Sequence, residues 1–186
     1  MTSRIIPLIL AASTFTPVLT AQSPATEMQS LAKSLAGEWS LEVHMEPSSE
    51  MPGGFNGSGH ETWRSGPAGL TLIEEETIAI PGQPMSLLGL IWWDRQANAF
   101  HGMECNNFLP YVCDLKGALN DITISWDGKQ LVLYEWETHS AKRSLWRESW
   151  TDITATSYTQ IGESGDGTAG SFHRVMTIHA MRPSTR

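Results

Sequence analysis

LAGEWSLEV, residues 35–43, is where the chain changes from a short polar lead-in to strand-forming sequence. From Trp39 onward, apolar and polar residues alternate, so that Trp39, Leu41 and Val43 fall on one face of an extended chain. Successive side chains of a β-strand point to opposite faces of its sheet. The segment therefore predicts a strand with one buried face, and it raises the question whether this strand begins a ligand-binding barrel.

Runs with strand composition continue to the end of the chain, and turn-forming residues separate them. QLVLYEWE (130–137) and FHRVMTIHAM (172–181) are typical runs, and IPGQP (80–84) is a typical turn. The turns recur about every 8 to 12 residues, which favours a sandwich or a barrel. No helical pattern is long enough to connect parallel strands. We expect an all-β fold, an antiparallel β-barrel of about ten strands, because closure removes exposed sheet edges.

The N-terminal segment has the features of an export signal. MTSR is short and basic, IIPLILAASTFTPVL is apolar, and TAQSPA supplies the small residues of a cleavage site after Ala21. An N-terminal anchor is the alternative, but the segment is too short for a good membrane span. We expect a signal peptide over 1–21, a segment with a short helix N-capped by Thr26 over 22–36, and a barrel domain over 37–183. The mature chain is then expected to be periplasmic or extracellular, without a stable membrane span.

Cys105 and Cys113 are separated by NNFLPYV. In an exported protein, two cysteines this close are expected to form a disulfide. Their spacing fits no common zinc pattern, and the six histidines are scattered, so we expect no metal site.

The composition bounds the classes of function. The chain has 186 residues, of which 40% are hydrophobic and 17% charged, with a formal net charge of −8. This composition suits one domain with a sizeable core. The negative charge repels the phosphates of DNA and RNA, which excludes nucleic acid as a partner. Trp 8 exceeds both Phe 5 and Tyr 3, which indicates an aromatic-rich core, an aromatic-lined cavity or both.

The Gly37-Glu38-Trp39 motif after a short helical segment resembles the start of the lipocalins and the wider calycin group. The resemblance implies that Trp39 closes one end of a calycin-like or lipocalin-like barrel. It also implies that an arginine of the last strand, Arg182 or Arg174, packs over that tryptophan.

A larger part of the chain resembles the exported domain-of-unknown-function 1579 family. The matching segments are LAGEWSLEV, GSGHETWRSGPAGLTLIEEE, IWWDRQANAFHGMEC and RESWTDITATSYTQIGESGDG, in this order. This resemblance implies a calycin-like barrel and no established activity. It extends distantly to nitrobindins, which bind haem through a histidine near the C-terminus. His179 is the nearest candidate here, and because the surrounding motif is only partly present, no cofactor is predicted.

The tryptophans and a few polar residues between them form the best candidate site. Glu148 lies between Trp146 and Trp150 on one strand face, and a carboxylate among indoles can orient a ligand in an aromatic cavity. The alternative is that this face points outward and covers an interface. The predicted ligand-binding residues are Trp63, Trp93, His101, Trp136, Trp146, Glu148 and Trp150.

Other chemistry has less support. The run Glu74-Glu75-Glu76 places its first and third carboxylates on one strand face, where paired carboxylates can perform acid–base catalysis. The simpler interpretation is a solvated face with one inward residue. The chain contains no G-x-S-x-G nucleophile motif, no P-loop and no dinucleotide-binding fingerprint.

The sequence thus favours a non-enzymatic barrel that binds a small hydrophobic or aromatic molecule. The first alternative is a hydrolase or isomerase that uses Glu148 or His101 as acid or base. The second is an assembly role, in which the apolar outer face around residues 88–92 binds a protein. The oligomeric state is not indicated.

Overall fold

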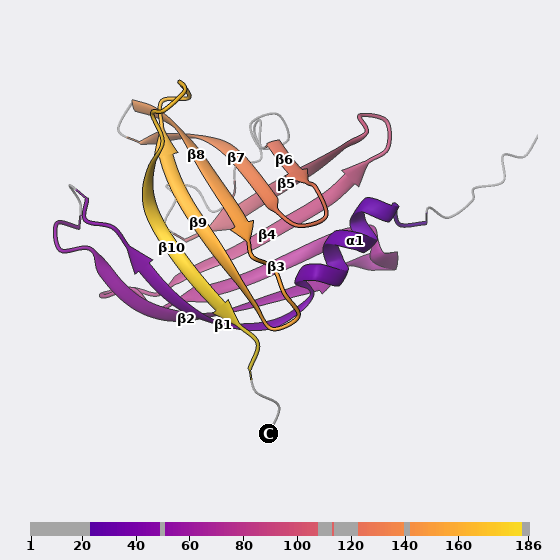
Figure 1. The fold of residues 1–186 in the computed structure, drawn as a ribbon, viewed down its shortest axis with the longest axis horizontal. Helices are drawn as coiled ribbons and strands as arrows, with labels where there is room; N and C mark the ends of the chain where they lie inside the picture. The colour runs from indigo at the N-terminus through magenta and orange to yellow at the C-terminus, as the bar shows by residue number, and fades with distance from the viewer. Residues whose placement is uncertain (1–22, 49–50, 108–112, 114–122, 140–141, 184–186) are drawn as a thin grey trace, which may run out of the picture.

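The computed structural model describes residues 23–48, 51–107, 113, 123–139 and 142–183. One α-helix precedes the strands, and a short 3-10 helix, η1 (Pro67–Gly69), lies between the second and third strands. Figure 1 shows the elements in chain order: α1 (Thr26–Leu35), β1 (Gly37–Met45), β2 (Phe55–Ser65), β3 (Thr71–Ile78), β4 (Met85–Asp94), β5 (Ala99–Asn106), β6 (Thr123–Trp126), β7 (Leu131–His139), β8 (Lys142–Thr151), β9 (Ser157–Gly165) and β10 (His173–Met181).

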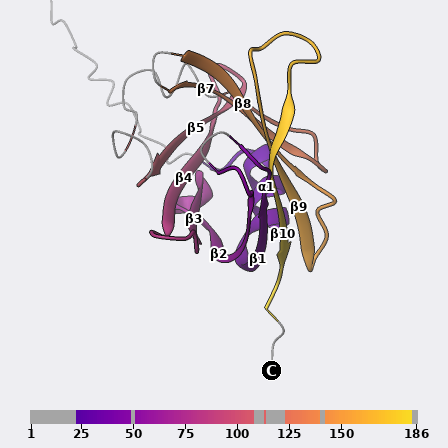
Figure 2. The ribbon, with the colours of Figure 1, turned by 90° about the vertical axis from the view of Figure 1, so that its left-hand side faces the viewer.

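The ten strands form one closed antiparallel barrel, as the sequence predicts. Each strand pairs with its neighbours in the chain, and β1 pairs with β10 from Ser40↔Met181 to Met45↔Met176 to close the cylinder. Among the described residues, β5 and β6 pair only at Phe100↔Ile124, which makes this the least extensively paired junction in the described part of the wall. Figures 1 and 2 show the strands wrapping around a common interior.

Helix α1 covers one end of the barrel. Its buried side chains, Met28, Leu31 and Leu35, are at most 1% exposed, and burial of a side chain of this size contributes about 2 kcal/mol. The helix begins at Thr26 with Ala25 as N-cap and without a side-chain capping bond, so the prediction that Thr26 is the N-cap was wrong. In Figure 1 the helix lies at one end of the strands, not along their outer surface.

The Gly37-Glu38-Trp39 motif forms the junction between helix and barrel. Gly37 has φ +134°, a conformation that favours glycine, and it turns the chain from α1 into β1. Trp39 donates its indole N–H to the carbonyl of Leu35 at 2.9 Å. The Arg182 guanidinium lies 4.0 Å from the centroid of the Trp39 ring, so the two ends of the barrel domain meet at this tryptophan.

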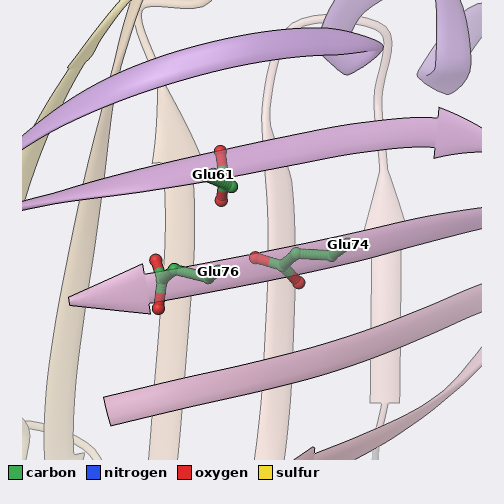
Figure 3. A group of neighbouring side chains, drawn as sticks. All are labelled: Glu61, Glu74 and Glu76. Carbon is green, nitrogen blue, oxygen red and sulfur yellow. The ribbon is translucent and has the colours of Figure 1, made fainter. Parts of the chain in front are cut away.

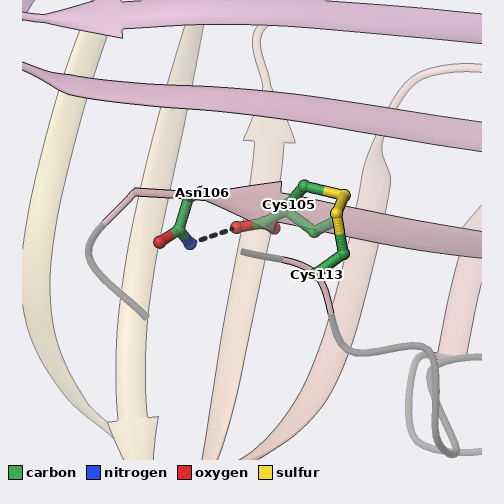
Figure 4. The surroundings of a disulfide bond; sticks show 4 residues. Cys105, Asn106 and Cys113 are labelled. Carbon is green, nitrogen blue, oxygen red and sulfur yellow. Dashed lines mark hydrogen bonds between the residues drawn. A yellow bond between two sulfur atoms is a disulfide. The ribbon is translucent and has the colours of Figure 1, made fainter. Parts of the chain in front are cut away.

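The outer wall carries the cysteine pair. Cys105 on β5 and Cys113 lie at disulfide-bond distance, with the two sulfurs 2.10 Å apart, as the sequence predicts. Figure 4 shows the bond beside Asn106, whose amide donates to the Glu104 carboxylate at 3.1 Å. The predicted signal peptide, 1–21, lies outside the described residues. In the described part of the chain, no helix has the length and hydropathy required to cross a membrane.

Candidate functional site

Strand alternation places buried glutamates inside the barrel. On β2 the inward positions include Glu61, which is 1% exposed. On β3 they include Glu74 and Glu76, which are 8% and 5% exposed, whereas Glu75 points outward and pairs with Arg64. The simpler interpretation of the run, a solvated face with one inward residue, was therefore wrong, because two of its three carboxyl groups are buried.

The three buried carboxyl groups lie together. Glu61 and Glu76 are direct cross-strand partners, and Glu74 is the next inward residue of β3. One oxygen of each group lies within 4.8 Å of an oxygen of each of the others. Figure 3 shows the three side chains gathered on β2 and β3. Hereafter they are called the acidic cluster.

Burial changes the ionisation of the acidic cluster. Loss of hydration, followed by the charges of the other carboxylates, raises the pKa of Glu74 and of Glu76 well above the ordinary value of 4.5. Burial also raises the pKa of Glu61, although hydrogen bonds, including that from Tyr158, oppose the shift. The cluster therefore holds protons at a pH where exposed glutamates are ionised.

Tyr158 links the acidic cluster to the closed end. Its hydroxyl donates a hydrogen bond to Glu61, and its ring packs edge-on against Trp39 with centroids 4.7 Å apart. Burial and the adjacent carboxylate raise the pKa of Tyr158, which keeps it a neutral donor. Tyr158, which packs at the closed end of the barrel, thus also orients the carboxyl group of Glu61.

Several buried acceptor atoms in this part of the barrel interior have no hydrogen-bond partner among the described residues. They are Glu61 Oε1, Glu76 Oε2 and the amide oxygen of Gln160, a β9 residue that is 3% exposed. A buried polar atom without a partner costs about 1–3 kcal/mol. Such atoms are unusual in a folded interior, and they indicate a group that donates to them or coordinates them.

A cavity of about 180 Å³ lies above the acidic cluster, toward the end of the barrel opposite α1. Its floor and sides carry the carboxyl groups of Glu74, Glu76, Glu104 and Glu148 and the amide of Gln160. The described residues that line it include no Lys, Arg or His. Asn106 is a further polar lining residue, and the rest of the wall is apolar: Val43, Met45, Phe55, Ile78, Ile80, Met85, Leu87, Trp146 and Met176.

Gly89 on β4 makes room for one of these carboxyl groups. It is the cross-strand partner of Glu74. A Cβ atom built on Gly89 would lie 2.5 Å from Glu74 Oε2, closer than such atoms approach in proteins. Any larger residue at position 89 would therefore force the Glu74 carboxyl group to shift from its present position.

The predicted residues divide between the cavity and its surroundings. Trp146 and Glu148 line the cavity, so the face of β8 that carries them points inward. Trp150 lies on the same face but deeper, 1% exposed, where it packs edge-on against Trp63 with centroids 6.2 Å apart. Trp63 and Trp150 thus form part of the packed end beneath the acidic cluster.

The other predicted ligand residues do not reach the cavity. Trp93 packs against Phe100 near the helix end of the barrel. His101 is on the outer face, stacked on Trp92 and 3.6 Å from Asp94. Because Glu148 points inward, His101 and Glu148 lie on opposite sides of the wall.

Two further predicted positions are also outside. Trp136 lies on the outer face under the Arg143 guanidinium, 4.4 Å from its ring centroid. His179, the candidate haem ligand, is exposed on the outer face of β10, and its ring contacts the Thr159 hydroxyl. Neither residue contributes to the acidic cavity.

Sequence reasoning missed Glu61, Glu104 and Gln160. Alternation in HETWR was a usable signal for Glu61, because it separates Glu61 and Trp63 from His60 and Thr62. No local signal distinguishes Glu104 or Gln160 from surface residues, since their environment is created by other strands. No protein-family model matches the sequence, and a search of curated proteins finds no match.

Proposed function

We propose that this protein is an exported, non-enzymatic barrel that binds a small, largely apolar molecule in the cavity lined by strands β1 to β5 and β8 to β10. The observation that carries the proposal is the 180 Å³ cavity, whose wall is mostly apolar with a few convergent polar groups. Small-molecule sites commonly have this combination, because the apolar wall supplies affinity and the polar groups fix orientation.

The electrostatics of the cavity restrict the ligand. Carboxyl groups from three strands face it, and no cationic side chain lines it among the described residues. An anionic ligand such as a fatty-acid carboxylate would be repelled by any ionised member of this set. A neutral molecule with an aromatic or aliphatic body and a hydrogen-bond donor fits best.

Export is part of the proposal. The N-terminal segment has the composition of a signal peptide, and the Cys105–Cys113 pair at disulfide distance fits an oxidising compartment. The resemblance to the domain-of-unknown-function 1579 family is compatible with this proposal and remains a prediction.

The test uses N-phenyl-1-naphthylamine, a neutral aromatic probe whose emission increases in apolar surroundings. We expect saturable binding with one site per chain. Leu87→Trp places a larger side chain in the cavity and should weaken the probe at least about tenfold, a change of about 1.4 kcal/mol.

Leu88→Trp is the matched control, since Leu88 is the next residue of β4 and is 42% exposed on the outer face. It should leave probe binding unchanged. Equal loss in both variants, or no saturable binding by the unmodified protein, would overturn the proposal.

A further inference from the structure

We propose that the acidic cluster, Glu61, Glu74 and Glu76, together with the amide oxygen of Gln160, is a calcium-binding site inside the barrel. The site goes beyond the apolar-ligand function and does not depend on it, because it lies in the floor of the cavity and not in its apolar wall.

The spacing of the carboxyl groups supports one shared ion. Calcium ligands lie about 2.3–2.6 Å from the ion, so two ligands on opposite sides are about 5 Å apart. One oxygen from each glutamate lies within 4.8 Å of the others. The three side chains can therefore contribute to one coordination sphere with little rearrangement.

Gln160 provides a second, independent indication. It comes from β9, whereas the acidic cluster comes from β2 and β3, and it lines the same cavity as Glu74 and Glu76. Gln160 is only 3% exposed, and its Oε1 accepts no hydrogen bond from the described residues. A neutral side-chain carbonyl oxygen that lines the same cavity as carboxyl groups is a typical calcium ligand.

The donor set selects the class of metal. All four groups offer oxygen, which hard cations such as Ca²⁺ and Mg²⁺ prefer, while zinc and copper favour nitrogen or sulfur. Mg²⁺ requires nearly ideal octahedral geometry and loses its bound water reluctantly, so it usually keeps several water ligands. A buried set from three separate strands suits the more tolerant geometry of Ca²⁺, with water from the cavity completing the coordination.

Charge balance links binding to proton release. The Tyr158 hydroxyl donates a hydrogen bond to Glu61 of the acidic cluster, and Glu104 and Glu148 add further carboxyl groups nearby. Carboxyl groups must be ionised to coordinate a metal ion, and the two positive charges of Ca²⁺ stabilise the ionised form. The glutamates therefore lose protons as the ion binds. Affinity should consequently increase as the pH increases.

The experiment is a calorimetric titration of the full mature protein with CaCl₂ up to 10 mM at pH 6 and pH 8, in two buffers that differ in ionisation enthalpy. We expect one ion per chain, tighter binding at pH 8, and proton release detected as a buffer-dependent enthalpy. Tryptophan-sensitised Tb³⁺ luminescence gives a second readout. Trp63 is the cross-strand partner of Glu74, Trp150 packs against Trp63, and Trp146 lines the same cavity as Glu74 and Glu76.

Glu76→Gln removes one charged ligand while nearly preserving shape, and it should weaken Ca²⁺ at least about tenfold. Glu75→Gln is the matched control on the outer face of the same strand, and it should bind Ca²⁺ as the unmodified protein does. Near-UV circular dichroism checks that both variants are folded.

The absence of Ca²⁺ binding at pH 8 would overturn the proposal. Ca²⁺ binding that is unchanged in Glu76→Gln would also overturn it, because the ions would then occupy adventitious surface sites. Probe binding by N-phenyl-1-naphthylamine in the same preparations separates the two proposals. Retained probe binding without Ca²⁺ rejects only the ion site, and Ca²⁺ binding without probe binding rejects only the apolar-ligand function.

Discussion

Glu61 on β2 and Glu76 on β3 lie directly opposite each other inside the barrel, each at most 5% exposed. Like charges at such a pair repel, and burial removes the water that would screen them. The fold therefore favours protonated carboxyl groups at this position. The free energy of unfolding and the affinity for Ca²⁺ should therefore both depend on the pH through the protonation of these two glutamates.

Stability in the presence of a chelator should decrease as the pH rises. The pKa values of Glu61, Glu74 and Glu76 are raised above the ordinary 4.5, so the folded state binds protons that the unfolded chain has lost. Their stabilising contribution is complete below about pH 4.5 and is lost as the pH rises through the raised values. Urea unfolding with EDTA between pH 5 and pH 9 should show a midpoint that falls with pH.

Glu74→Gln should reduce this pH dependence, because a neutral amide replaces a group that ionises with difficulty. Its midpoint should exceed that of the unmodified protein at pH 8. Glu75→Gln removes only an exposed ion pair with Arg64, worth less than about 1 kcal/mol, and should keep the original slope. A midpoint that rises steadily with pH in the unmodified protein would contradict the raised pKa values.

Arg182 should stabilise the closed end of the barrel. Its guanidinium donates to the carbonyls of Ala36 at 2.8 Å and Ala155 at 2.9 Å while it covers the Trp39 ring. Arg182→Ala loses all three contacts and should lower the free energy of unfolding by about 2 kcal/mol.

Arg182→Lys should recover less than half of that loss, since an ammonium lacks the planar fork that reaches two carbonyls. Arg174→Ala, at an exposed position of β10, the strand that ends just before Arg182, should change stability by less than about 0.5 kcal/mol. Chemical denaturation measures all three variants. Equal effects of Arg182→Ala and Arg174→Ala would contradict a specific role for Arg182.

The barrel was predictable because its signals are local. Alternation from Trp39 onward, short turns and the lack of crossover helices define an antiparallel meander, and closure follows from the cost of exposed edges. Strand periodicity also placed the side chains of Glu74 and Glu76 on one face. Their burial was not predictable, because nothing in EEE indicates which of its two faces meets the interior.

The site required knowledge of which strands meet across the barrel. Glu148 and Trp146 were selected from a local pattern, and the structure places them in the cavity. His101 and Trp136 were selected for their chemistry, but their register turns them outward. Gln160 lies 86 residues from Glu74 in the chain, and only the closed topology brings its amide to the same cavity.

Reduction of the Cys105–Cys113 bond should destabilise the protein moderately. The bond joins residues 8 apart in the sequence, and closing a loop of this size contributes about 2–3 kcal/mol in the chain-entropy account. Unfolding by urea with and without a reductant should show this difference. The double variant Cys105→Ser/Cys113→Ser should match the reduced protein and should not respond to the reductant.

Gly89→Ala should disturb the acidic cavity from the neighbouring strand. The added methyl group would meet Glu74 Oε2 at 2.5 Å and Glu74 Cβ at 3.1 Å, so the glutamate must shift within a packed wall. Overpacking costs about 1–3 kcal/mol, and the entropic benefit of replacing glycine returns less than about 1 kcal/mol. We expect a net loss of about 1 kcal/mol in the free energy of unfolding together with weaker Ca²⁺ binding.

Gly53→Ala is the control, because no atom lies within 4 Å of its added Cβ and the stability of this variant should not fall. In a Glu74→Ala background the cost of Gly89→Ala should shrink, since the clashing carboxylate is gone; an unchanged cost in this double-mutant cycle would show that Gly89 acts through some other contact.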